Sequence, residues 1–269
     1  MRRTITGFSN PTVKLLRSLR DKKHRRREGL FLAEGLRLLT DALASRRVPQ
    51  MLVMAQGRSA HPLLAELEQA VAAAGGEVVE TTPDILGKIT GKDNPQSVAG
   101  VFAEFDTSLA ALDREQAKIW LVAQALRDPG NLGTMLRTGD AVGAGGLILV
   151  DDCADPFSVE AVRASMGAVF TQAIARAPWD EFIAWLRAPG APPAQLVAAS
   201  LRNPTDYRAA PYQAPCFVMV GNESQGLPAE YEAQCDLTVT MPMRGRADSL
   251  NAAIAAAVLA YEVLARLER

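Results

Sequence analysis

The stretch IWLVAQALRDPGNLGTMLRTGDAVGAGGLILV, residues 119–150, sets the fold class of the chain. Its first five residues are all apolar and predict a buried strand, residues 131–142 predict a helix, and residues 146–150 predict a second buried strand. A strand, a helix and a further strand in this order are typical of a parallel sheet covered by helices. We therefore expect the polar loop after the first strand to lie at the sheet edge where open α/β folds bind ligands.

The same alternation continues to the C-terminus, so that residues 119–269 predict one parallel-sheet α/β domain. The further predicted helices cover residues 158–167, residues 179–186 and the segment from Asp248 or Ser249 to the end. The further predicted strands cover residues 172–175, 196–200, 216–220 and 237–240. The apolar face of the terminal helix consists of Leu250, Ile254, Ala257, Val258, Tyr261 and Leu264.

Residues 106–118 are polar, carry no strand signal and are interpreted as a linker. Residues 1–105 before it predict a smaller α/β domain. Its first helix follows Asn10-Pro11, because asparagine is a good N-cap and proline fits the first helical position. Its other predicted elements are helices over residues 35–45, 61–74 and 83–89, and strands over residues 49–54, 77–81 and 98–105.

The composition excludes several classes of protein. The chain has 269 residues, of which 48% are hydrophobic and 22% charged, as in globular proteins that bury a core. The longest apolar run, residues 252–261, is far shorter than the roughly 18 to 20 residues of a membrane span, and no apolar region follows the charged N-terminus as in a signal peptide. Cys153, Cys216 and Cys235 are too few and too far apart for a disulfide framework or a zinc site. With two histidines besides, we predict no metal and a cytoplasmic protein.

The charge is unevenly distributed. Residues 1–30 contain ten lysines and arginines against Asp21 and Glu28, which gives +8, while the remaining residues carry −9. Such a basic segment on an acidic body favours a polyanionic partner, and nucleic acid is the usual one. The alternative is a solvated basic arm without a partner.

Common catalytic motifs are absent from the sequence. Gly143, Gly145 and Gly146 follow a predicted helix, whereas the glycines of a dinucleotide fingerprint follow a strand. No Walker loop occurs, and the serine of residues 221–226 is misplaced for a nucleophile elbow. Because residues 119–269 contain no histidine, the sequence disfavours a serine-type triad as well.

Three polar segments follow predicted strands of the second domain. They read RDPGNLGTMLRT (residues 127–138), GNESQG (residues 221–226), and MPM (residues 241–243) followed by SLN (residues 249–251). With these motifs in this order, the chain closely resembles the SpoU/TrmH family of RNA ribose 2′-O-methyltransferases in the SPOUT superfamily. The resemblance covers nearly all of residues 126–251.

The N-terminal half supports this resemblance. Asn10-Pro11 with Val13, Lys14 and Leu16, and the later pattern RRREGLFLAEGLR (residues 25–37), are similar to the family's RNA substrate-binding domain, which has a ribosomal-protein-like fold. The resemblance implies a trefoil knot in the second domain, S-adenosylmethionine as methyl donor, a homodimer and structured RNA as substrate. The residues expected to bind RNA are Arg17, Lys22, Lys23, Arg25, Arg26, Arg27 and Arg37.

The resemblance also implies the site residues. Arg137 takes the catalytic position, and the ribose and phosphate are organised by Asn131, Glu223, Ser249 and Asn251. The donor is expected at Gly221, Met241 and Leu250, together with Ser200, Asn222 and Met243. Each residue has a plainer interpretation: Asn131 as a helix cap, Arg137 as a surface arginine, Glu223 as a solvated carboxylate, and Gly221 and Gly226 as turn residues. Asp248 and Ser249 are expected N-caps of the last helix, and Asn251 is expected inside its first turn.

We therefore predict transfer of a methyl group to a ribose 2′-hydroxyl in structured RNA, with ribosomal RNA favoured over transfer RNA. Because the guanidinium pKa lies above about 12, Arg137 fits an organiser of the hydroxyl better than a general base, although both roles stay open. Two alternatives remain: a non-catalytic RNA-binding protein with the same fold, and a base methyltransferase of the wider superfamily. The first is disfavoured because Asn131, Arg137, Glu223 and Asn251 are all present, and the second because it would lack the paired Asn and Arg.

Overall fold

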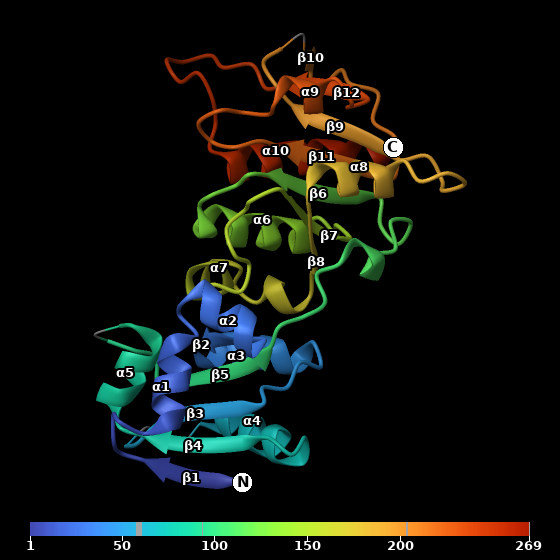
Figure 1. Cartoon of the computed structure of the whole chain (residues 1–269). Coiled ribbons are helices and arrows are strands. Elements are labelled where there is room, and N and C mark those ends of the chain that lie inside the picture. The colour runs from blue at the N-terminus through green and yellow to red at the C-terminus, as the bar shows by residue number, and fades with distance from the viewer. Residues whose placement is uncertain (58–60, 93, 203, 269) are drawn as a thin grey trace. The chain divides into compact units, whose positions relative to one another are not determined.

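Figure 1 shows the computed structural model of the chain, which describes residues 1–57, 61–92, 94–202 and 204–268. The chain forms two compact units. The first contains Met1–Phe105 together with Asp155–Thr171, and the second contains Asp106–Ala154 and Gln172–Arg269. The helix that the sequence predicts over residues 158–167 therefore packs with the N-terminal segment and not, as expected, with the second domain. Each unit contains its own β-sheet.

The first unit has a mixed sheet with the strand order β1-β4-β3-β5-β2. The strands are β1 (Arg2–Ile5), β2 (Leu30–Glu34), β3 (Met51–Ala55), β4 (Glu77–Thr81) and β5 (Val98–Ala103). Strand β4 pairs in parallel with β1 and β3, whereas β5 is antiparallel to β2 and β3. The helices are α1 (Pro11–Ser18), α2 (Lys22–Glu28), α3 (Leu36–Ala44), α4 (Pro62–Ala73), α5 (Pro83–Thr90), α7 (Val159–Ala164) and the short η2 (Ala168–Phe170).

Two apolar clusters hold this unit together. Helix α1 contributes Val13, Leu16 and the adjacent Leu19, which pack with strand residues such as Ile5 and Val53. An aromatic cluster has ring centroids 4.8 to 6.2 Å apart and consists of Phe31, Phe102, Phe105, Phe157 and Phe170. Because Phe157 and Phe170 flank α7, this cluster attaches residues 155–171 to the sheet of the first unit.

The basic N-terminal segment forms two short helices. Asn10 caps α1 by accepting a hydrogen bond from the Thr12 amide (2.9 Å), as predicted. Asp21 caps α2 by accepting from the amides of Lys23 (2.8 Å) and His24 (3.3 Å), and these donors lower the pKa of its carboxyl. Gly29 has a left-handed conformation (φ 64°) and ends α2.

The second unit has a parallel seven-stranded sheet in the order β10-β12-β9-β11-β6-β7-β8, which confirms the predicted parallel sheet. Its strands are β6 (Ile119–Gln124), β7 (Gly146–Val150), β8 (Ala173–Ala177), β9 (Gln195–Ala199), β10 (Thr205–Asp206), β11 (Cys216–Val220) and β12 (Leu237–Thr240). Its helices are η1 (Leu109–Ala111), α6 (Pro129–Ala141), α8 (Trp179–Leu186), α9 (Ala229–Glu232) and α10 (Ala252–Leu267). The strand order places β12, β9, β11 and β6 side by side, so the loops at their carboxyl ends are neighbours.

Residues 106–118, predicted as a linker, are packed against the second unit. Leu109, Leu112 and Ala117 contact its apolar core. The Arg114 guanidinium donates to the carbonyl of Leu186 (2.7 Å), and the Trp120 indole donates to the Arg114 carbonyl (3.1 Å). This segment is therefore part of the second unit's structure.

Helix α10 has two apolar faces of different kinds. Its small residues face inward, where α10 lies along α6 and β11 (Figure 1). The predicted apolar face points outward instead: Leu250, just before the helix, and Ile254, Val258 and Tyr261 within it are exposed, Ile254 by 49% and Tyr261 by 54%. None of the helices in the described ranges is long and apolar enough to cross a membrane.

Candidate active site

The loops after β9, β11 and β12, with the start of α10, line a cavity of about 470 Å³ in the second unit. Its lining includes all six residues predicted to bind the donor: Ser200, Gly221, Asn222, Met241, Met243 and Leu250. Glu223 and Ser249 also line it. The cavity thus lies at the carboxyl end of the parallel sheet, where the sequence predicted a ligand site.

The loop after β11 is closed by its own hydrogen bonds. The Asn222 side chain accepts from the amides of Ser224 (2.9 Å) and Gln225 (3.2 Å) and donates to the Ala125 carbonyl (2.9 Å) after β6. A Cβ at Gly221 would lie 2.5 Å from the Gly226 carbonyl carbon, and Gly226 has a positive φ of 68°. Both glycines are therefore explained by the turn itself.

Asn131, Glu223 and Asn251 form a hydrogen-bonded chain beside the cavity. Nδ2 of Asn131 donates to Oε1 of Glu223 (3.0 Å), and Nδ2 of Asn251 donates to Oδ1 of Asn131 (2.9 Å). The three residues come from α6, the loop after β11 and the start of α10. Since the amide nitrogen and the amide oxygen of Asn131 both have hydrogen-bond partners, these partners fix the orientation of its side chain.

Two of the plainer interpretations are wrong in this structure. The N-cap of α6 is Asp128, which accepts from the Asn131 amide (2.6 Å), so the Asn131 side chain is not a cap. The N-cap of α10 is Asn251, whose Oδ1 accepts from the amides of Ala253 (3.0 Å) and Ile254 (3.2 Å). Asn251 therefore has two functions, because its amide nitrogen still reaches Asn131.

Arg137 is not part of this chain. It lies six residues after Asn131 on α6, and at about 100° per residue this places it about 120° around the helix. Its side chain is exposed and takes part in none of the hydrogen bonds or ion pairs between described residues. Ser249 is exposed at the cavity edge, where its hydroxyl contacts the Asp248 carboxylate (3.4 Å).

The cavity has the mixed lining that a ligand with apolar and charged parts requires. Met241, Met243 and Leu250 supply apolar surface, whereas Glu223 and Asp248 supply negative charge. Arg202 also lines the cavity, and its guanidinium is paired with Glu232 (3.1 Å). This lining fits S-adenosylmethionine, because the flat faces of its adenine ring can pack on apolar side chains and its sulfonium and amino groups are positively charged. Among the residues that the structure describes, no group of three histidines, cysteines or carboxylates could hold a metal ion.

The basic residues predicted to bind RNA do not all reach the surface. Arg25 is only 2% exposed, and its guanidinium is held by Asp155 (2.7 and 3.1 Å) and by the carbonyls of Leu19 and Arg20 (both 2.8 Å). A buried guanidinium with these partners cannot contact a phosphate, so Arg25 is removed from the predicted set. Arg27 is exposed but pairs with Glu28 (2.7 Å), and Lys22 is half-buried. The exposed members are Arg17, Lys23, Arg26, Arg27 and Arg37.

The three cysteines are free thiols outside the cavity lining. Burial raises the pKa of Cys153 to about 11 and the pKa values of Cys216 and Cys235 to about 12. They are therefore protonated at neutral pH and unsuited to nucleophilic catalysis.

Comparison with known proteins agrees with this geometry. Residues 118–261 match the family model described as the SpoU rRNA Methylase family, and residues 10–100 match that of the MRM3-like substrate binding domain. The 23S rRNA (guanosine(2553)-2'-O)-methyltransferase RlmP of Bacillus subtilis (strain 168) is 32% identical over 260 residues, which cover 96% of this chain and 98% of that protein.

Two crystal structures solved with AdoMet (S-adenosylmethionine) are also similar. An rRNA methyltransferase from Sinorhizobium meliloti has a TM-score of 0.91 and 40% identity, with coverage of 99% of this chain and 98% of that one. The SpoU methyltransferase AviRb from Streptomyces viridochromogenes has a TM-score of 0.88 and 29% identity, with coverage of 96% and 98%. The fold and the site thus define a methyltransferase with a separate substrate-binding region. The chain belongs to the SpoU rRNA methylase family.

Proposed function

We propose that this chain transfers the methyl group of S-adenosylmethionine to a ribose 2′-hydroxyl in ribosomal RNA. The family membership supports the reaction, and the ribosomal RNA named for the relative from Bacillus subtilis supports that substrate over transfer RNA. The observation that carries the proposal is the hydrogen-bonded chain of Asn131, Glu223 and Asn251 beside a cavity suited to the donor.

In this proposal the chain of three residues positions the ribose. A displacement at the methyl carbon requires the 2′-oxygen to lie in line with the donor and to lose its proton as the bond forms. Asn131 is oriented by Glu223 and Asn251, so it presents a fixed amide toward the nucleotide. Ser249, at the cavity edge, adds a hydroxyl to the same region.

Arg137 is proposed to act on the reacting hydroxyl as an organiser. Its guanidinium stays protonated at neutral pH, so it stabilises negative charge on the oxygen and contacts the adjacent phosphate rather than accepting the proton. Because Arg137 is exposed and lies away from Asn131 on α6, we propose that it completes a site shared with a second copy of the chain.

The donor is proposed to bind in the cavity among the loops after β9, β11 and β12, where it supplies a methyl group on a positively charged sulfur. Ser200, Gly221 and Asn222 would offer polar groups. Met241, Met243 and Leu250 would cover its apolar parts. The carboxylates of the lining match its positive charge.

The proposal extends to the organisation of the chain. Residues 1–105, with which residues 155–171 pack, act as the RNA substrate-binding domain with a ribosomal-protein-like fold. Residues 106–154 and 172–269 form the methyltransferase domain with a trefoil knot. The chain is a homodimer in the cytoplasm. The exposed apolar face of α10, made by Leu250, Ile254, Val258 and Tyr261, supports the homodimer because a monomer would leave it in water.

A methylation assay with the full chain tests the function. Labelled S-adenosylmethionine is incubated with ribosomal RNA, transfer RNA and DNA of matching sequence, and the products are digested to nucleosides for mass spectrometry. We expect 2′-O-methylnucleosides from ribosomal RNA and no transfer to DNA. Methylated bases would instead favour a base methyltransferase, and donor-independent RNA binding without transfer would favour the non-catalytic alternative. Asn131→Ala serves as the inactive control.

A further inference from the structure

The positive charges of residues 1–30 are used in two different ways. Four arginines are neutralised within the first unit by carboxylates: Arg2 by Glu68 and Glu80, Arg3 by Glu77, Arg25 by Asp155, and Arg27 by Glu28. By contrast, Lys14, Arg17 and Arg20, on α1 and the turn after it, have no ion pair with any residue of the described ranges, and all three are exposed. Of the exposed cations of residues 1–30 without an ion pair in the described ranges, these three therefore lie together on α1 and its following turn, and Lys23 and Arg26 lie on α2.

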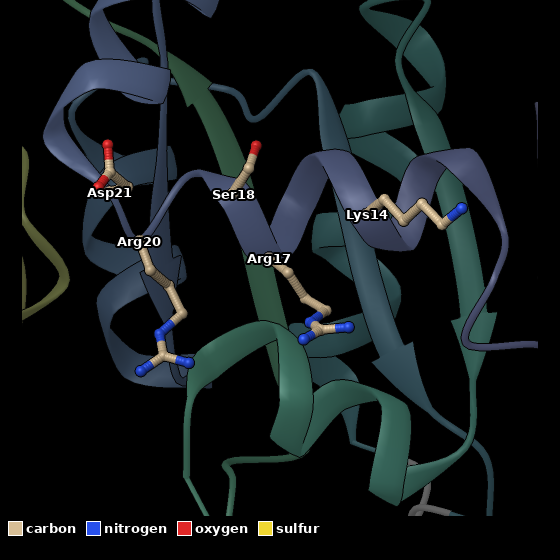
Figure 2. A pocket seen from close by; sticks show the side chains of 5 residues that line it. All are labelled: Lys14, Arg17, Ser18, Arg20 and Asp21. Carbon is tan, nitrogen blue, oxygen red and sulfur yellow. The ribbon is translucent and has the colours of Figure 1, made fainter.

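Arg17 and Arg20 border a large groove of the first unit. The groove has a volume of about 920 Å³ and lies between α1, α5 and the loops that follow β3 and precede β5. Figure 2 shows Arg17 and Arg20 extending from α1 and its following turn toward the neighbouring helix, while Ser18 and Asp21 point the other way. We call the groove of about 920 Å³ the α1–α5 groove. The side chains that define it are Phe8, Arg17, Arg20, Gln56, Lys88 and Gln96.

The charge of the α1–α5 groove is positive. Arg17, Arg20 and Lys88 line it without ion pairs to described residues, and Lys92 is neutralised by Glu34 (2.5 Å). The one carboxylate in its described lining is Asp84. Arg20 lies against the end of α5, since a Cβ at Gly91 would come within 2.2 Å of its guanidinium carbon. The cations therefore line the groove on both of its helices.

The rim of the groove carries groups that suit bases rather than phosphates. Phe8 is 48% exposed in a turn before α1 and lines the groove, so about half of its ring surface is available to a ligand. The amide side chains of Gln56 and Gln96 are exposed on the loops after β3 and before β5. Proteins that bind single strands combine a basic groove with aromatic rings on which unpaired bases stack.

We infer that the α1–α5 groove binds a single-stranded segment of the RNA substrate, with Arg17, Arg20 and Lys88 on the phosphates and Phe8 stacked on an unpaired base. This inference rests on the proposed function for the presence of an RNA substrate. It differs from the sequence-based expectation, which placed most of the RNA contacts on α2. A duplex keeps its bases stacked on one another, so it would leave Phe8 without a partner.

A pair of charge-matched double variants of the full chain tests the groove. The probe is a fluorescent single-stranded RNA of mixed sequence, titrated at several salt concentrations, with an RNA duplex of the same sequence as competitor. Substitution suits this test better than deletion of residues 1–30, because that segment carries the buried Val13, Leu16 and Leu19. R17A/K88A removes two groove cations, and K23A/R26A removes two exposed cations of α2.

We expect R17A/K88A to weaken binding of the single strand at least tenfold, to reduce the slope of log affinity against log salt by up to about 1.4, and to abolish the preference over the duplex. K23A/R26A is expected to keep that preference. If instead K23A/R26A shows the larger loss, or if polyglutamate competes as well as RNA does, the inference is wrong.

Substitution of Phe8 gives a second test, which changes no charge and probes the stacking contact. Phe8→Ala should weaken single-strand binding by roughly 5- to 150-fold, the equivalent of one stacked base, with an unchanged salt slope. Phe8→Trp should restore the affinity, which loss of folding would not permit. Equal affinities for wild type and Phe8→Ala would overturn the stacking contact.

The assay also separates this inference from the proposed function. If the wild-type chain methylates ribosomal RNA and the groove variants bind RNA normally, the inference about the groove is wrong and the proposed function is supported. If the groove variants lose single-strand binding while the wild type transfers no methyl group, the inference about the groove is supported and the proposed function is wrong.

Discussion

The amide nitrogen of Asn251 donates to Oδ1 of Asn131, 120 residues earlier in the chain, while Oδ1 of Asn251 caps α10. One side chain therefore begins the last helix and orients a residue of the site. This relationship depends on the packing of α10 along α6, since β12 and β6, the strands that precede these helices, are separated by two strands in the sheet. Stability and activity should both depend on Asn251, through different atoms.

Substitution of Asn251 can separate these two contributions. Asn251→Asp keeps an oxygen that caps α10 but cannot donate to Asn131, and it places a second carboxylate near Glu223. We expect its thermal midpoint to stay close to that of wild type while kcat falls at least about tenfold. Asn251→Ala should lose activity and also about 1 kcal/mol of stability, because the cap is lost. Calorimetry and methyl-transfer kinetics on both variants provide the measurement, and full activity in Asn251→Asp would contradict the role assigned to the amide.

Arg137 should affect chemistry without affecting donor binding. Arg137→Ala is expected to lower kcat about 10²-fold or more, as loss of a positioned catalytic group does, with donor affinity near normal. Arg137→Lys should also be strongly impaired, because lysine keeps the charge but loses the planar pair of donors. Arg163→Ala, another exposed helical arginine, is the matched control. Steady-state kinetics gives kcat, and calorimetry gives the affinity for the methyl donor. Near wild-type turnover in Arg137→Ala would show that Arg137 is an ordinary surface residue.

The second sheet was predictable because its strands are continuous apolar runs. All residues of β6, β7 and β11 are buried, which is the pattern of central parallel strands. Strand β1 was missed because Ile5 is the only buried residue of its four, so no apolar alternation marks it. Strand β2 has an apolar run, but a run of that length does not distinguish strand from helix.

The residues of the candidate site could be predicted from the sequence, but the hydrogen bonds between them could not. The residues came from the three motifs, yet Asn131 and Glu223 are 92 residues apart and meet through a strand order that the sequence does not state. The same limit explains Arg25. It sits between basic neighbours of similar appearance, and only its partner 130 residues later shows that it is interior.

The buried pair of Arg25 and Asp155 should contribute strongly to the stability of the first unit. Arg25→Ala leaves the Asp155 carboxylate without its cation, and removal of one partner of a buried pair costs about 3 to 5 kcal/mol. Arg25→Met combined with Asp155→Leu should recover much of that loss. Because Trp120, Trp179 and Trp185 all lie in the second unit, the measurement is hydrogen exchange of peptides from the first unit rather than tryptophan fluorescence. An unchanged exchange rate in Arg25→Ala would contradict the prediction.

The three thiols should resist alkylation in the folded chain. Burial raises the pKa of Cys153 to about 11 and the pKa values of Cys216 and Cys235 to about 12, against about 8.5 for a free thiol. Since the thiolate is the reactive form, iodoacetamide at pH 8 should modify the native chain slowly and the urea-unfolded chain rapidly at all three positions. Mass spectrometry of timed samples gives the rates. Rapid modification of any cysteine in the native chain would show an accessible thiol of lowered pKa.

The exposed apolar face of α10 should hold two copies of the chain together. Sedimentation equilibrium is expected to give about twice 28.8 kDa. Ile254→Asp places a carboxylate in the middle of the face, where burial against a partner would be costly, so this variant should be monomeric and should lose methyl transfer if the site is shared. Leu63→Asp, at a 40% exposed leucine of α4, is the matched control and should leave both mass and activity unchanged. Full activity from a monomeric Ile254→Asp variant would contradict the shared site, and a dimeric one would move the interface away from α10.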